Sequence, residues 1–342
     1  MLSRVAQNIY WFARYVERAE NTARLINVNG NLLLDLPGEF QFGWSPLLLI
    51  TGSRATFDQH YEAVDETRVI NFLLGDPRNP GSVLSSLSYA RENLRTTRDV
   101  IPREAWEQLN DLYLFVRDRL PMGLSRRGRY EFLKRIILGS QTLTGLLAGS
   151  MSHTHAYHFL RLGRHLEGAD MTTRIIDVRS ANLLRHTEEL TPFDNIQWMS
   201  VLKSLSGYQM YRQQVRLRVR GPDVLRFLLQ DTLFPRAVNH SLEALEACLE
   251  RLPRSHLPRA KLAQLRDQVI QARVAELAHT GLHEFIDLLQ IGMGEIHNAI
   301  ADVYFPRLPT VETEPASCPP QVPGEAQVQE APSAQWQNQD IR

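Results

Sequence analysis

The chain has 342 residues, of which 43% are hydrophobic and 22% charged, a composition that excludes collagen-like, mucin-like and wholly disordered proteins. Basic and acidic side chains both number 38, so the net charge is zero and no chain-wide basic field attracts nucleic acid. The two cysteines are too few for a disulfide scaffold, and no Cys/His spacing indicates zinc.

The sequence also lacks the signals of export, membrane insertion and nucleotide binding. Its first residues have no apolar signal core. The longest unbroken apolar run, residues 47–50, is far shorter than the about 20 residues that cross a bilayer. Glycine-rich phosphate loops, metalloprotease motifs and nucleophile elbows are missing. We therefore expect a cytoplasmic protein that has no cofactor. We expect it to bind neither nucleic acid nor a membrane.

Residues 1 to about 305 follow the period of helices. Apolar side chains recur at three and four positions, and strand-like alternation is rare, which predicts an all-α fold, a helical bundle. Proline and glycine mark the expected breaks between helices, at residues 36–38, 76–81, 121–123, 220–223 and 251–253. Beyond residue 305 the chain is rich in Pro, Glu and Gln, which predicts a disordered tail over residues 306–342.

An internal repeat is the most informative feature of the sequence. Residues 10–28 match residues 160–178 at an offset of 150, with seven identities. Two further matches follow in the same order: residues 69–76 with 224–231 at an offset of 155, which continues through Pro80 and Pro235, and Glu131-Phe132 with Glu284-Phe285 at an offset of 153. These matches predict two related helical halves, residues 1–150 and 151–305.

The repeated segment combines an apolar helix face with a charged one. On the charged face, Arg14, Glu17, Arg18, Glu20 and Arg24 of the first copy correspond to a second set at residues 164–174. Related halves usually pack about a two-fold axis, which would bring the two sets together. We call the combined set the Arg/Glu face: Arg14, Glu17, Arg18, Glu20, Arg24, Arg164, Glu167, Asp170 and Arg174.

Three interpretations of this face are open. It can be a solvated surface with weak ion pairs. It can be a buried or ligand-binding network, which the retention of arginine and glutamate in both copies favours, because ordinary surface positions exchange freely. It can hold a metal through Glu17, Glu20, Glu167 and Asp170, which we disfavour because the histidines of di-iron Glu-x-x-His motifs are missing and arginines repel cations.

At these residues the sequence resembles a known family. The stretches Leu2-Ser-Arg-Val-Ala and Tyr10-Trp-Phe-Ala-Arg-Tyr-Val-Glu-Arg-Ala-Glu20 look like the opening of the alpha-E proteins, the DUF403 family, which is named for a Glu-Arg motif, here Glu17-Arg18. The resemblance covers residues 1–305 and implies an all-helical fold. The second copy departs from the pattern at Gly168, where arginine is more common. Other stretches that agree are Ala90-Arg-Glu-Asn93, Trp106-Glu-Gln-Leu-Asn110, Phe159…Glu167…Ala169-Asp170-Met171 and Asp231-x-x-Phe234-Pro-Arg236.

The resemblance implies partners more than chemistry. Alpha-E proteins resemble companions of circularly permuted ATP-grasp proteins, and transglutaminase-like peptidases share their gene neighbourhoods. The first hypothesis is therefore an accessory or co-catalytic subunit of an amide or peptide ligase, which binds its partner or an anionic substrate through the Arg/Glu face.

The second hypothesis is a stand-alone enzyme. Glu17 or Glu167 would act as general acid or base on an amide, an ester or an acyl phosphate. Neighbouring arginines favour the ionised carboxylate, which suits electrostatic orientation better than acid catalysis. The residues therefore favour the first hypothesis.

Overall fold

The structure, a computed structural model, describes residues 2–35, 43–183, 194–215 and 218–305. These residues form helices and connecting turns, and none of them lies in a strand, which confirms the predicted all-α fold. The predicted disordered tail, residues 306–342, lies outside the described residues. The α-helices are α1 (Ser3–Asp35), α2 (Ser45–Ile50), α3 (Arg54–Asp58), α4 (Glu66–Leu74), α5 (Val83–Arg95), α6 (Arg103–Leu124), α7 (Arg126–Ser150), α8 (His155–Leu183), α9 (Asp194–Ser204), α10 (Tyr208–Gln214), α11 (Gly221–Gln230), α12 (Val238–Leu249), α13 (His256–Gln271), α14 (Val274–Leu277) and α15 (Leu282–Tyr304).

Three of the predicted breaks lie at helix boundaries. Residues 76–81 connect α4 to α5, residues 251–253 connect α12 to α13, and α11 begins within residues 220–223. The break at residues 36–38 lies outside the described residues.

The break predicted at residues 121–123 lies two residues later, at Ser125 between α6 and α7, because α6 continues through Pro121 to Leu124. Neighbouring apolar side chains explain the difference. Leu120, Met122 and Leu124 pack against the core, so burial keeps the last turn helical although proline removes one backbone donor.

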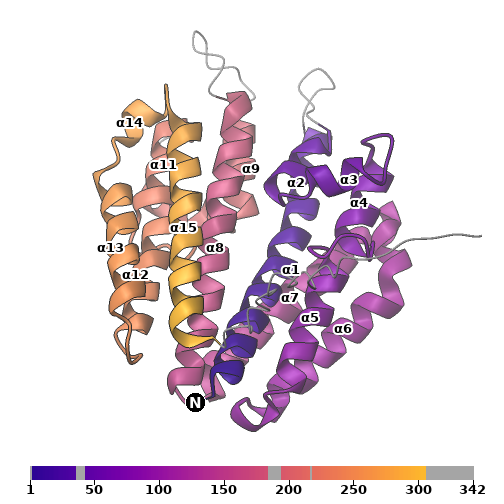
Figure 1. The fold of residues 1–342 in the computed structure, drawn as a ribbon. Coiled ribbons are helices and arrows are strands. Elements are labelled where there is room, and N and C mark those ends of the chain that lie inside the picture. The colour runs from indigo at the N-terminus through magenta and orange to yellow at the C-terminus, as the bar shows by residue number, and fades with distance from the viewer. Residues whose placement is uncertain (1, 36–42, 184–193, 216–217, 306–342) are drawn as a thin grey trace, which may run out of the picture. The chain divides into compact units, whose positions relative to one another are not determined.

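Helices α1 and α8 lie at the centre of residues 1–305. Helix α1 packs against α5, α7 and α8, while α8 also packs against α12 and α15 (Figure 1). The self-matching segments of the sequence lie on α1 and α8, on α4 and α11, and on α7 and α15. The origin of this arrangement in a duplication, with a division near residue 150, stays a prediction.

The backbones of α1 and α8 approach each other closely at Gly163. A Cβ atom at this position would lie 2.2 Å from the Tyr10 carbonyl oxygen. Glycine has no Cβ atom and so avoids this clash. Further along the same two helices, the Arg179 guanidinium donates to Asn29 Oδ1 at 2.8 Å in a buried contact. The close approach brings the charged residues of both helices within reach of one another.

We predict that Gly163→Ala destabilises the protein, because the added methyl group forces α1 and α8 apart. Overpacking of this kind costs about 1–3 kcal/mol, which urea unfolding monitored by circular dichroism will measure. The control is Gly145→Ala in α7, where an added Cβ meets no atom within 4 Å. Alanine should be neutral or stabilising there, by up to about 1 kcal/mol. Equal effects of the two variants would contradict the prediction.

Candidate functional site

Three carboxylates are buried where α1 meets α8. The exposed fraction is 5% for Glu17 and 2% for both Glu20 and Glu167. A buried carboxylate is strongly destabilising unless cations and hydrogen-bond donors compensate its lost hydration. The low exposure argues against a solvated surface, and it makes the partners of each carboxylate the central question.

Glu167 of α8 takes its partners from α1. The Arg14 Nε donates to Glu167 Oε2 at 2.7 Å. The Arg18 guanidinium binds both carboxylate oxygens, through Nε to Oε1 at 2.6 Å and through Nη2 to Oε2 at 3.2 Å. The Arg14 guanidinium also lies over the Trp11 ring, 5.0 Å from its centroid. Two arginines of α1 thus neutralise one glutamate of α8.

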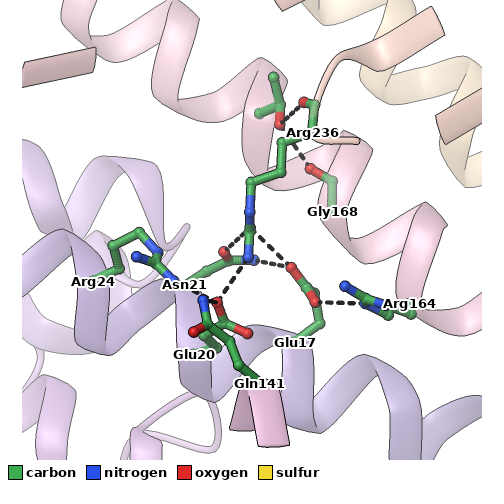
Figure 2. A network of polar contacts seen from close by, with 9 residues as sticks. Glu17, Glu20, Asn21, Arg24, Gln141, Arg164, Gly168 and Arg236 are labelled. Atoms are coloured by element: carbon green, nitrogen blue, oxygen red, sulfur yellow. Dashed lines mark hydrogen bonds and ion pairs between the residues drawn. The ribbon is translucent and has the colours of Figure 1, made fainter. Parts of the chain in front are cut away.

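Glu17 of α1 takes one arginine from α8 and a second from elsewhere. The Arg164 Nε lies 3.4 Å from Glu17 Oε2, so α1 and α8 each supply an arginine to the glutamate of the other. The second arginine is Arg236, whose Nη1 donates to Glu17 Oε1 at 3.0 Å (Figure 2). The Asn21 side-chain amide completes the set with a bond of 3.1 Å to Oε1.

Glu20 lies beside Glu17 and shares Arg236 with it. The Arg236 Nη2 donates to Glu20 Oε1 at 2.8 Å, and Arg24 Nη2 donates to the same oxygen at 2.5 Å. The Gln141 side chain of α7 approaches this oxygen at 3.3 Å (Figure 2). One guanidinium therefore joins two buried carboxylates of α1.

The turn before α12 positions Arg236. The Asp231 carboxylate accepts the backbone amides of Leu233 and Phe234 at 2.8 and 2.6 Å, which fixes the turn. The Thr172 hydroxyl of α8 then bonds to the Arg236 carbonyl oxygen at 2.9 Å. The backbone is thereby held against α8 while the side chain extends to α1.

Asp170 and Arg174 stand apart from these bonds. Arg174 Nε donates to Asp170 Oδ2 at 2.9 Å, four residues back on α8. Both side chains line an open pocket of about 240 Å³, together with Arg18 and Glu167. The structure thus brings Arg14, Arg18 and Arg164 onto the two central glutamates, whereas Arg174 reaches neither of them.

The arginines decide the protonation of the two central glutamates. Burial alone raises the pKa of Glu17, but Arg236 and Arg164 outweigh it and hold the pKa below its usual range. Burial likewise raises the pKa of Glu167, and Arg14 and Arg18 bring that pKa below the ordinary value. Both groups are therefore ionised at neutral pH and cannot donate a proton as general acids.

Sequence reasoning missed Arg236 and Gln141 as members of the site, whereas helix spacing pairs Asn21 with Glu17, as the structure has it. One signal for Arg236 is present in the sequence. Gly168 leaves the second copy without a counterpart of Arg18, so an arginine from another segment is needed beside Glu17. Arg236 stands at the end of the Asp231-x-x-Phe234-Pro-Arg236 stretch. For Gln141, which α7 brings in, we find no such signal.

The described residues offer neither a metal site nor a membrane-spanning helix. In residues 2–35, 43–183, 194–215 and 218–305, no group of three or more His, Cys, Asp or Glu side chains is arranged to hold a metal ion. Within the same ranges, none of the helices combines the length and the apolar character that a membrane crossing needs.

Residues 1–305 match the Alpha-E family, which is described as "a predicted alpha-helical domain with a conserved ER motif". The chain belongs to this family. Glu17-Arg18 is a Glu-Arg pair of α1, with Glu17 bound by Arg164 and Arg236 and Arg18 bound to Glu167.

The Alpha-E chain is also similar to longer mycobacterial proteins. An uncharacterized protein of Mycobacterium bovis is 22% identical over 321 residues, which cover 88% of this chain and 36% of the relative. An uncharacterized protein of Mycobacterium tuberculosis H37Rv is 21% identical with the same coverage. The chain thus spans about a third of the length of these curated relatives. No solved structure matches the Alpha-E chain.

We predict that Glu17→Gln strongly destabilises the Alpha-E chain. Glutamine keeps the shape but leaves Arg164 without its carboxylate and Arg236 with Glu20 alone, and breaking a buried pair costs about 3–5 kcal/mol. Urea unfolding at pH 7 will measure the loss. The control is Glu92→Gln, which breaks an exposed pair with Arg95 and should leave the unfolding midpoint unchanged. A loss no larger than that of the control would contradict the buried network.

The lowered pKa values also predict the response to acid. The folded pKa of Glu17 and Glu167 lies below the ordinary 4.5, so the unfolded chain takes up these protons first as the pH falls. Their contribution is fully present above pH 4.5 and is lost as the pH falls through the folded pKa. Unfolding free energies measured from pH 6 to 3 should therefore fall less steeply for Glu167→Gln than for the native chain. Parallel curves would refute the assignment.

Proposed function

We propose that the chain is a cytoplasmic accessory or co-catalytic subunit of an ATP-grasp-type amide or peptide ligase system that modifies peptides or proteins. Its partner is a circularly permuted ATP-grasp protein, with a transglutaminase-like peptidase as a further associate. The Arg/Glu face binds the partner or an anionic substrate. The resemblance to alpha-E proteins supports the partner class. The length of the mycobacterial relatives is consistent with such a helical domain acting beside other domains.

The charge balance at the α1–α8 contact carries the binding part of the proposal. Six arginines meet four carboxylates there, so positive charge remains after every carboxylate is paired. A purely structural network needs no such surplus. The pocket beside Glu167 exposes part of this charge to small molecules. An anionic group of a substrate or of the partner is the natural complement.

The stand-alone enzyme is less well supported. Both candidate carboxylates are ionised, and both oxygens of Glu167 already accept arginine hydrogen bonds. A general base needs a lone pair that reaches the substrate proton, and a general acid needs a proton at neutral pH. Orientation and charge stabilisation remain as the roles that this geometry supports.

The proposal is tested by reconstitution with the circularly permuted ATP-grasp protein of the same organism. We expect no turnover by the chain alone, a stable complex with the ATP-grasp protein, and a change in ATP-dependent amide formation when the chain is added. Arg18→Lys keeps the charge but removes the planar fork. It should weaken the binding of the partner or of the substrate by about tenfold.

The matched control is Arg95→Lys on the exposed end of α5, which should leave complex formation and turnover unchanged. Turnover by the purified chain alone would favour the stand-alone enzyme. Absence of both a complex and any effect on the ligase would overturn the proposal.

A further inference from the structure

An open pocket of about 240 Å³ lies beside Glu167 and its partner Arg18, and no described side chain fills it. Arg18 and Thr22 of α1 and Asp170 and Arg174 of α8 line one part of it. The other part comes from the end of α2, which packs on α8, and from the turn between α4 and α5. The pocket thus lies where four segments distant in sequence meet.

The corresponding place beside Glu17 is occupied. There the Arg236 guanidinium reaches in from the turn before α12 and bonds to Glu17 and Glu20 (Figure 2). The predicted repeat pairs Pro235 with Pro80, so the counterpart of Arg236 is Gly81, which lines the open pocket. A glycine at this turn position leaves the space that a guanidinium fills on the other side.

The second arginine of each central glutamate comes from a different segment. For Glu167 it is Arg18 on the helix, and for Glu17 it is Arg236 on the turn. The counterpart of Arg18 is Gly168, just as the counterpart of Arg236 is Gly81. Both glutamates are therefore neutralised, but the pocket of about 240 Å³ lies on the side of the helix-borne arginine, whereas the pocket at Glu17 and Arg164 holds about 20 Å³.

The pocket has hydrogen-bond donors to spare. Glu167 is already occupied, since its two oxygens accept three bonds from Arg14 and Arg18. Arg174 uses only Nε for Asp170, so among the described residues its Nη1 and Nη2 make no hydrogen bond. The acceptor left in the pocket is Asp170 Oδ1. Unused donors on charged groups favour an anion over a cation.

Thr22 gives an independent indication. Its hydroxyl is buried and has no hydrogen-bond partner among the described residues, although a buried polar group normally has one. Its counterpart Thr172 bonds to the carbonyl oxygens of Gly168 and Arg236, each at 2.9 Å. Thr22 lines the pocket, and the turn between α4 and α5 makes no bond to its hydroxyl, so this donor is left for a ligand.

Gly52 allows Arg174 to lie at the pocket. Its φ of +65° is a conformation that other residues avoid, and a Cβ there would lie 3.2 Å from Arg174 Nη1. The guanidinium therefore rests against a glycine, with its Nη atoms beside the pocket.

We propose that this pocket binds the oxyanion head group, a carboxylate or a phosphate, of a small ligand. Arg174 and Arg18 supply charged donors, and Thr22 supplies a neutral one. The role of this ligand as a ligase substrate rests on the proposed function, whereas its binding to the isolated chain does not.

The test is calorimetric titration of the full chain with inorganic phosphate and, separately, with acetate. Sodium chloride keeps the ionic strength constant, because salt screens exposed charges. We expect saturable binding of one ligand per chain for at least one of the two anions, and the tighter one identifies the head group. Methylguanidinium chloride is the opposing probe and should not bind.

Two variants locate the binding. Gly81→Arg places on the open side the residue that fills the other side, and it should abolish anion binding. Arg174→Lys keeps the charge and removes the fork, and it should weaken binding about tenfold. The matched control is Arg54→Lys, which alters an equivalent Arg–Asp pair four residues apart on α3 and should bind the anion normally. Circular dichroism and thermal melting show whether each variant folds. If Gly81→Arg does not fold, the anion binding of Arg174→Lys tests the site.

Absence of saturable binding of both anions at millimolar concentration overturns the site. Unchanged binding in Arg174→Lys, or binding of methylguanidinium instead, overturns it as well. The proposed function fails separately. The chain can bind the anion, and lose affinity in Arg174→Lys, yet form no complex with the ATP-grasp protein and have no effect on it. That result would support the pocket and reject the ligase role.

Discussion

The neutralisation of two buried glutamates at the contact of α1 and α8 is the constraint on which the centre of this structure depends. Glu17 and Glu167 lie on adjacent helices, and each helix sends an arginine to the glutamate of the other. A buried ion pair adds little stability over an apolar contact, but losing one partner is severe. The network therefore fixes how α1 and α8 meet, and the glycine at position 163 lets their backbones come close enough to form it.

Helical periodicity was sufficient to predict the all-α fold and the charged face of the repeated segment. Both helices extend beyond the matched residues: α1 covers Ser3–Asp35 and α8 covers His155–Leu183. Their ends depend on local packing that periodicity does not report. Pro121 shows the same limit, since packing of neighbouring apolar residues outweighs the helix-breaking tendency of one proline. Arg236 is a tertiary contact that joins residues more than 200 positions apart, so helix patterns alone cannot assign it to Glu17.

The two sides of the α1–α8 contact carry similar charged residues but differ in the partners that these residues bind. Beside Glu17 the Arg236 guanidinium bonds to both Glu17 and Glu20 and closes the space. Beside Glu167 an arginine remains with free donors next to a pocket. A near-symmetric sequence pattern thus gives one side built for stability and another side with capacity for a ligand. The difference lies at two positions, Arg18 against Gly168 on the repeated helix and Gly81 against Arg236 on the turn.

The second arginine of each central glutamate comes either from the helix or from the turn. This choice limits which single substitutions the chain can accept at these positions. A Cβ at position 168 lies 3.8 Å from Glu17 Oε1, so an arginine there would start beside the carboxylate that Arg236 already bonds. Losing Arg236 first strips Glu17 of a cation, and gaining an arginine at position 168 first crowds two guanidinium groups around one carboxylate. Both orders pass through an unfavourable intermediate. We therefore expect the two positions to be energetically coupled, so that a substitution at one is tolerated better when the other changes with it.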